Sequence, residues 1–225
     1  MTAGAGQAGD FEAIVLAGGR AARLGGADKP GLRVAGTPML SSVTAVAGRA
    51  GAAAVIVVGP ARPRLAGLPP GTAFVTEQPP GAGPVPALRR GLARAGHPVV
   101  ALLAADLPFL TSGTLRLLLG VLAGEQGPAG AVLADDAGAP QWLVSCWQRA
   151  ALSAAAADYP GTSLRGLLGP LRPALVRARP DAGQPPPWFD CDTAQQLALA
   201  RRWAAAGQAR PPGPARAETR PEAPR

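Results

Sequence analysis

The chain has 225 residues, enough for one α/β domain with a hydrophobic core or at most two small domains. Its composition, 48% hydrophobic and 16% charged, is typical of a globular protein and argues against a disordered one. The formal net charge of +8 favours anionic partners, but the arginines are scattered and few aromatic side chains are available to stack on bases. We therefore expect small phosphorylated molecules, and no nucleic acid, as ligands.

Several classes of catalytic site are disfavoured by the cysteine and histidine content. Cys146 and Cys191 are far apart in the sequence, so they indicate neither a disulfide framework nor a zinc site, and we interpret both as buried reduced thiols. His97 is the only histidine, which argues against a multi-histidine metal site and a Ser-His-Asp triad. The start of the sequence does not resemble a signal peptide, and the longest apolar runs are too short to cross a bilayer. We expect a cytoplasmic protein without a membrane partner.

The predicted elements begin after a flexible leader at residues 1–10. Short, continuously apolar runs alternate with helical stretches, as in strands buried on both faces of a parallel sheet. Strands are predicted at residues 13–16, 54–58, 73–76 and 99–104. Helices are predicted from a Thr37 cap with Pro38 in first position to about Gly51, over residues 84–95, and over residues 112–123 behind a Thr111 cap.

The pattern changes after Gly130. Residues 131–133 and 142–147 predict an antiparallel hairpin, and a short helix is predicted at 163–168. A loop, WFDCDT, then leads into a last helix at 194–205 with Thr193 as its cap, and the Pro- and Arg-rich residues 208–225 predict a disordered tail. The order of elements predicts a single-domain α/β fold over residues 11–207. Its sheet is Rossmann-like and mostly parallel, with helices on both faces and a small antiparallel hairpin addition.

A glycine-rich segment, LAGGRAARLGGADK, follows the first predicted strand at residues 16–29. Its four glycines allow the backbone to approach a ligand and to direct N–H groups at an anion. The segment leaves the carboxyl end of a strand, where open α/β sheets bind their ligands. It is neither a P-loop nor a dinucleotide fingerprint, because the required spacings are absent. By itself, it is equally compatible with a tight connection in a glycine-rich protein.

Lys29 favours the phosphate-binding interpretation. It is the only lysine among the 22 Lys and Arg residues of the chain, and it closes the glycine-rich segment. A lysine presents a compact point charge suited to a phosphate oxygen, whereas Arg23 in the same segment can supply a planar fork. The alternative is an exposed surface lysine without a ligand.

Acidic residues follow a predicted strand and precede a predicted helix. Asp106 comes directly after the apolar run at 99–105, where its carboxylate would point into the ligand crevice and could hold a magnesium ion. The alternative for Asp106 is a turn or a helix cap. Asp190 and Asp192 alternate across a cysteine, so in an extended segment they lie on one side of the backbone.

The motif L-A-G-G-x-x-x-R-L-G-G-x-D-K at residues 16–29 resembles the signature of the molybdenum cofactor guanylyltransferase family, which are nucleotidyltransferases with a Rossmann-like domain. The resemblance continues in order through GTPML, TEQPPGAGPVPAL, LAADLPFL, PQWLVSCW and FDCDT, and covers roughly residues 11–206. It implies the transfer of GMP from GTP to the phosphate of molybdopterin, with release of pyrophosphate and with Mg²⁺ as cofactor.

The same resemblance implies roles for individual residues. Arg23, Lys29 and Asp106 would be catalytic, and Asp106 and Asp192 would be the magnesium ligands, while Asp190 matches less well and is open to interpretation as a loop or capping residue. The nucleotide would be bound by Leu16, Ala17, Gly18, Gly19, Lys29, Gln78 and Asp106.

Two residues depart from the pattern of the family. Gln78 stands where an acid usually helps to read the nucleotide, which leaves the selectivity for guanine open, and Gly31 replaces a larger apolar residue. Two other functions therefore stay in consideration: a nucleotidyltransferase for another phosphorylated acceptor such as a sugar phosphate, and a non-catalytic nucleotide-binding accessory protein. The expected partners are GTP and molybdopterin, and a contact with a molybdoenzyme or its chaperone is left open.

Overall fold

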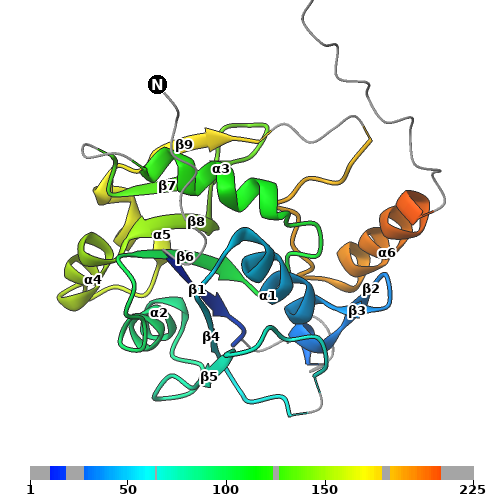
Figure 1. Cartoon of the computed structure of the whole chain (residues 1–225), viewed down its shortest axis with the longest axis horizontal. Coiled ribbons are helices and arrows are strands. Elements are labelled where there is room, and N and C mark those ends of the chain that lie inside the picture. The colour runs from blue at the N-terminus through cyan, green and yellow to red at the C-terminus, as the bar shows by residue number, and fades with distance from the viewer. Residues whose placement is uncertain (1–10, 19–27, 64, 124–126, 179–182, 209–225) are drawn as a thin grey trace, which may run out of the picture.

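The computed structural model describes residues 11–18, 28–63, 65–123, 127–178 and 183–208 (Figure 1). The expected leader at 1–10 and nearly all of the expected tail lie outside this range. A seven-stranded sheet forms the centre, in the order β5-β4-β1-β6-β8-β7-β9. Its strands are β1 (Phe11–Leu16), β4 (Ala54–Val58), β5 (Ala73–Val75), β6 (Val99–Ala104), β7 (Gly130–Ala134), β8 (Pro140–Gln148) and β9 (Ala174–Arg177).

Helices surround this sheet, and a small second sheet lies to one side of it. The helices are α1 (Met39–Ala50), α2 (Pro84–Leu92), α3 (Ser112–Leu122), α4 (Arg149–Ala157), α5 (Leu164–Leu168) and α6 (Ala194–Gln208). Two short 3-10 helices are η2 (Lys29–Gly31) and η3 (Gly169–Leu171), and the second sheet pairs β2 (Arg33–Val34) with β3 (Thr37–Pro38).

The predicted α/β fold with a mostly parallel sheet is confirmed. Strand β1 pairs in parallel with β4 and β6, β4 with β5, and β7 with β9. Among the described strands of the main sheet, β8 alone is antiparallel, to both β6 and β7. The predicted hairpin is therefore β7 and β8, and its second strand joins it to the edge of the parallel part.

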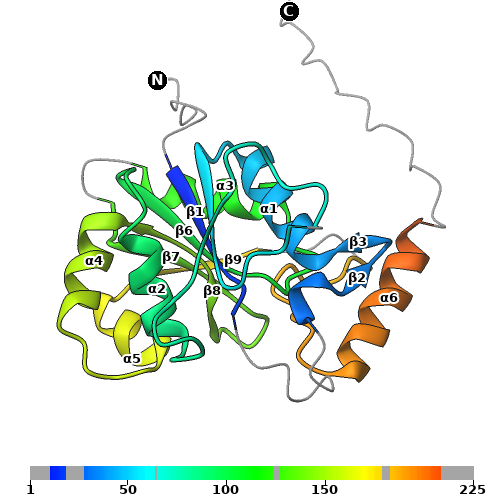
Figure 2. The same ribbon diagram turned by 90° about the horizontal axis from the view of Figure 1, so that it is seen from below.

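Alternate residues of the strands pack on opposite faces of the sheet, which explains why these strands are apolar throughout. On one face, Ala13 and Val15 of β1 pack in a cluster with α1 and α3. On the other face, Ile14 packs in a cluster with α2, α4 and α5, and Figure 2 shows the two groups of helices on either side of the sheet. Helix α2 approaches β1 closely, because a Cβ atom on Gly91 would lie 2.5 Å from a methyl group of Ile14.

The prediction that Thr37 caps helix α1 is wrong. Thr37 and Pro38 form strand β3, and the helix begins at Met39 without a side-chain cap. Ala35 and Gly36 both have positive φ angles, of 51° and 77°, as in the tight two-residue turns that join antiparallel strands. This turn carries Thr37 back alongside Val34 before the helix starts.

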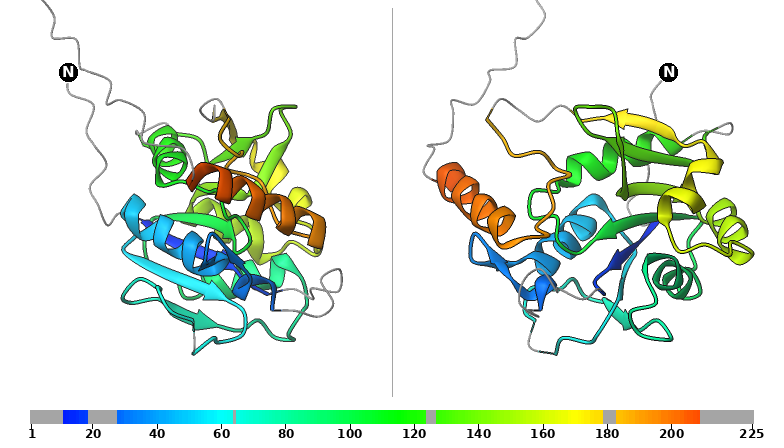
Figure 3. Two further views of the ribbon diagram at one scale, coloured as in Figure 1. Left: turned by 90° about the vertical axis from the view of Figure 1, so that its right-hand side faces the viewer. Right: turned by 180° about the vertical axis from the view of Figure 1, so that it is seen from behind.

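Helix α6 is set apart from the main sheet, beside β2 and β3 (Figure 3). Its Leu197 and Ala200 pack with Val34 and Met39 in a third apolar cluster. Trp203 adds an aromatic contact to Phe189, with ring centroids 4.9 Å apart. This packing joins α6 to β2, to the start of α1 and to the loop that precedes α6. No described helix is long and apolar enough to cross a membrane.

Both cysteines are buried and unpaired, as interpreted from the sequence. Burial raises the pKa of the Cys191 thiol to about 12 and also raises the pKa of Cys146. Both thiols therefore stay protonated near neutral pH, which is the state of an inert structural cysteine.

Candidate functional site

A cavity of about 900 Å³ opens at the carboxyl ends of β1 and β6. Strand β1 has β4 on one side and β6 on the other, so the order of the strands reverses at β1. Open α/β sheets bind their ligands at such a point, beyond the carboxyl ends of the strands. Some of the lining residues lie at or after the ends of β1, β5 and β6: Leu16, Ala17, Gly18, Lys29, Glu77, Gly81, Gly83, Asp106 and Leu107. Others come from β8, the start of α5 and the loop before α6: Gln141, Trp142, Ser163, Arg165, Trp188, Asp190 and Asp192.

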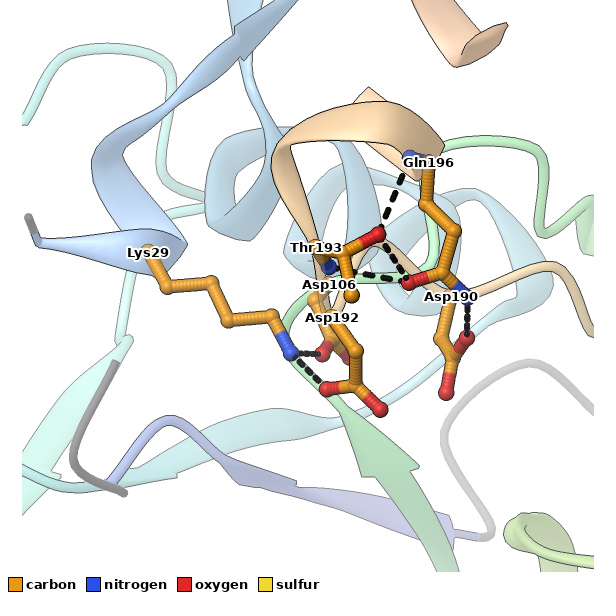
Figure 4. Close-up of polar contacts among 6 residues, drawn as sticks. All are labelled: Lys29, Asp106, Asp190, Asp192, Thr193 and Gln196. Atoms are coloured by element: carbon orange, nitrogen blue, oxygen red, sulfur yellow. Dashed lines mark hydrogen bonds and ion pairs between the residues drawn. The ribbon is translucent and has the colours of Figure 1, made fainter. Parts of the chain in front are cut away.

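Three charged side chains from distant parts of the sequence meet in this cavity (Figure 4). Lys29 is the first residue of η2, Asp106 lies two residues beyond β6, and Asp192 lies two residues before α6. The Lys29 ammonium forms an ion pair with Asp106 and lies 2.5 Å from Oδ1 of Asp192. The side chains of Lys29 and Asp106 are mostly buried, at 18% and 15% exposure, whereas Asp192 is half exposed.

The loop that carries Asp190 and Asp192 is held by the first turn of α6. Thr193 Oγ1 accepts a hydrogen bond from the Gln196 N–H at 3.1 Å, and Gln196 Oε1 accepts one from the Thr193 N–H at 2.9 Å. This reciprocal pair is a capping box, and it confirms the predicted Thr193 cap. The Gln196 amide also donates to Asp190 Oδ1 at 3.2 Å, so the cap extends into the acidic loop (Figure 4).

The charges of the cluster influence each other's ionisation. Burial lowers the pKa of Lys29, but Asp106 and Asp192 outweigh it, so the pKa lies above its ordinary value and the ammonium is kept charged. Burial, together with the nearby Asp192 and Asp106 carboxylates, raises the pKa of Asp190. Two carboxylates share one ammonium, which leaves the cluster attractive to a further cation.

Asp106 and Asp192 could hold a magnesium ion. Their carboxylate oxygens are the hard donors that magnesium prefers, and they converge on one point, now taken by the Lys29 ammonium. Within the described residues, no group of three or more His, Cys, Asp or Glu side chains is arranged to hold a metal by itself. The pair therefore fits an ion that completes its coordination with substrate phosphates and water, as magnesium commonly does.

Comparison with known families places the chain among nucleotidyltransferases. Residues 13–178 match the model of the MobA-like NTP transferase domain. The chain belongs to this family. The matched residues do not include Asp190, Asp192 or α6, so the place of the acidic loop in the candidate site rests on the structure. A comparison with curated protein sequences gave no match.

Solved structures share the fold of this family member. A nucleotidyl transferase from Methanothermobacter thermautotrophicus is 21% identical with a TM-score of 0.70, over 88% of this chain and 98% of that one. Molybdopterin-guanine dinucleotide biosynthesis protein A from Archaeoglobus fulgidus is 16% identical with a TM-score of 0.65, over 87% and 99%. 2-C-methyl-D-erythritol 4-phosphate cytidylyltransferase from Thermus thermophilus is 22% identical with a TM-score of 0.60, over 86% and 98%.

The structure brings most of the sequence-predicted site residues together. The cavity is lined by Leu16, Ala17, Gly18, Lys29, Asp106, Asp190 and Asp192. Gln78 is exposed and is not among the residues that line the cavity. The predicted Gly19 and Arg23 lie outside the described residues.

Sequence reasoning missed several residues of the site. Glu77, the neighbour of Gln78, is buried, lines the cavity and accepts a hydrogen bond from the Gly81 N–H at 3.0 Å. Gln196 could have been found, because a threonine followed three residues later by glutamine is the sequence signal of a capping box. Trp142, Trp188 and Arg165 gave no such signal, since only the fold brings β8, the loop before α6 and α5 to the same cavity.

We expect Thr193→Ala to lower both stability and turnover. Loss of a threonine N-cap costs about 1 kcal/mol, which corresponds to a fall of about 2–4 °C in melting temperature for a domain of this size. Turnover should fall as well, because the same capping box orients the loop with Asp190 and Asp192. Thr111→Ala is the matched control: it removes the cap of α3, away from the cavity lining, and should lower the melting temperature alone. Wild-type turnover in Thr193→Ala would mean that the cap does not orient the acids.

Proposed function

We propose that the protein transfers GMP from GTP to the terminal phosphate of molybdopterin and releases pyrophosphate. The observation that carries this proposal is the meeting of Lys29, Asp106 and Asp192 at the carboxyl ends of β1 and β6, beside the glycine-rich segment. A nucleotidyltransferase needs cationic groups at the triphosphate and carboxylates for magnesium at that position. Membership of the MobA-like family supports nucleotidyl transfer, and the motif at residues 16–29 supports guanylyl transfer to the pterin.

In the proposed reaction, residues 16–18 and Lys29 hold the triphosphate at the edge of the sheet. An oxygen of the acceptor phosphate attacks the α-phosphorus in line, a new P–O bond forms, and the bond to the pyrophosphate oxygen breaks. Magnesium, held by Asp106 and Asp192, would supply charge neutralisation at the phosphates and Lewis acidity. A phosphate monoester has a second pKa of about 6, so the acceptor is already largely a dianion at neutral pH. The protein thus contributes position and charge, and no general base is required.

Three further residues that line the cavity suit the proposed acceptor. Trp142 and Trp188 are half-buried, and Arg165 is exposed. Tryptophan faces offer stacking area to a conjugated ring system, and arginine offers a fork for a phosphate. A cavity of about 900 Å³ lies near the upper end of the range for small-molecule sites, about 300–1,000 Å³, and gives room for two substrates.

Pyrophosphate release measured with each nucleoside triphosphate, with and without molybdenum cofactor, tests this function. The expected result is release that requires magnesium, GTP and the pterin. Release with a sugar phosphate or polyol phosphate instead would support the alternative acceptor class, which the shared fold with a cytidylyltransferase keeps relevant. Nucleotide binding without release under any condition would support the non-catalytic accessory protein.

We expect Gln78→Asp to sharpen the preference for GTP over ATP. A charged acceptor makes hydrogen bonds up to about twice as strong as a neutral one, and guanine offers N–H donors where adenine does not. Gln78 is exposed and directly follows Glu77, which lines the cavity. Competition between GTP and ATP for turnover is the measurement. An unchanged ratio would mean that residue 78 does not read the base.

A further inference from the structure

Arg62 lies four residues beyond β4 and connects three separate stretches of backbone. Its Nε donates to both carboxylate oxygens of Asp28, at 2.9 and 3.0 Å, and its Nη2 donates to Oδ1 of Asp28 at 2.7 Å. Nη2 also donates to the Ala17 carbonyl at 3.2 Å, and Nη1 donates to the Pro60 carbonyl at 3.0 Å. The Arg62 side chain is only 11% exposed, so it is held in one place by these contacts.

Two of these partners, Ala17 and Asp28, lie at the two ends of the glycine-rich segment. Ala17 directly follows β1, and Asp28 directly precedes Lys29. A single guanidinium therefore binds both the residue that follows β1 and the residue that precedes η2. These contacts use N–H groups on all three nitrogens of the guanidinium, arranged in a fixed fork, and lysine with its single ammonium could not make the same contacts.

The absence of a side chain at Gly31 leaves room for the Asp28 carboxylate. A Cβ atom on Gly31 would lie 2.7 Å from Oδ2 of Asp28, closer than such atoms come in proteins. A side chain at this position would therefore press on the carboxylate that Arg62 binds.

We propose that Arg62 is a positioning residue that fixes the two ends of the glycine-rich segment through Ala17 and Asp28 and so sets the place of Lys29. Asp28 and Lys29 are adjacent, so displacement of the Asp28 carboxylate moves the start of the lysine side chain. Lys29 must reach Asp106 and Asp192 across the cavity, and it can do so only from a defined starting point. The link to catalysis rests on the proposed function, whereas the link to the position of Lys29 does not.

Because Lys29 is the only lysine, its ammonium can be followed without interference from other side chains. The experiment is acetylation of the full-length protein by an amine-reactive ester at fixed pH and without nucleotide, with the rate at Lys29 measured by peptide mass spectrometry. We expect several-fold faster acetylation in Arg62→Ala and Arg62→Lys than in wild type. Gly31→Ala should act in the same direction, although alanine by itself favours the folded chain over glycine.

Arg149→Ala is the matched control. Arg149 is half-buried, and its Nε donates to the His97 carbonyl at 2.8 Å, just before β6 and so at the other end of this strand from the cavity. Its loss should leave the acetylation rate of Lys29 unchanged. Asp28→Asn carries the same expectation as Arg62→Ala and replaces it if that variant does not fold, as judged by melting. Wild-type acetylation rates in the folded Arg62 and Asp28 variants would overturn the proposal.

Kinetics separate a positioning role from a merely structural one. Displacement of a reacting group by about an ångström can cost on the order of a hundredfold in rate. We therefore expect kcat to fall in Arg62→Lys by more than KM rises, while the melting temperature changes little. Faster acetylation with unchanged kcat would overturn the catalytic part of the proposal. If the wild type released no pyrophosphate with any acceptor, the proposed function would fail and the acetylation result would still decide the role of Arg62.

Discussion

Lys29→Arg is expected to lose on the order of a hundredfold in turnover, although the substitution keeps the charge. The Lys29 ammonium fits between Asp106 and Asp192 in a mostly buried position. A guanidinium is broader and planar, so it cannot take the same point without moving the carboxylates or the triphosphate. Steady-state pyrophosphate release at saturating magnesium and GTP is the measurement.

The stability of Lys29→Arg should change little, because arginine can still pair with both acids. We expect a shift in melting temperature of no more than about 2–4 °C, equivalent to about 1 kcal/mol. Arg201→Lys is a suitable control, since Arg201 lies on α6 outside the cavity lining and donates to the Arg33 carbonyl from an exposed position. Turnover of Lys29→Arg equal to that of wild type would remove Lys29 from the phosphate site.

The alternation of strands and helices could be predicted from the sequence because burial on both faces makes each strand continuously apolar. Strand β6, with Val100 to Leu103 fully buried, is an example. The missed strands lack this signal. Strand β9 lies at the edge of the sheet and exposes Leu175 to 55%, and β2 and β3 have two residues each, too few for any periodicity. Tertiary pairing, rather than local sequence pattern, decides the structure of such short or exposed strands.

The residues of the candidate site likewise include some that could be predicted from the sequence and some that could not. Asp106 comes just after a strand that the sequence marks, and Lys29 closes the glycine-rich segment that follows another, so their places in the crevice could be predicted from the topology of parallel strands. The role of Arg62 could not, because this arginine follows β4 in an irregular stretch and its partners are 34 and 45 residues away. One arginine among many has no local signal, and only the folded chain shows which of them closes the glycine-rich segment.

Asp106→Asn is expected to abolish most turnover, with a loss of at least about a hundredfold, comparable to other removals of a charge-stabilising group. Asparagine keeps the shape but supplies one neutral oxygen in place of a carboxylate, so both the hold on magnesium and the partner of the Lys29 ammonium are weakened. The fold should survive, because Asp192 still pairs with Lys29 and Asp106 lies at the cavity wall rather than in the core.

The measurement for Asp106→Asn is pyrophosphate release over a range of magnesium concentrations, together with melting in the absence of ligands. We expect the magnesium requirement to shift to higher concentration as turnover falls, because one of the two proposed carboxylate ligands has been removed. Asp158→Asn, which removes an exposed carboxylate at the end of α4, controls for the loss of one negative charge from the protein. A loss of turnover without any change in the magnesium dependence would mean that Asp106 acts through Lys29 alone, and full activity would place the metal elsewhere.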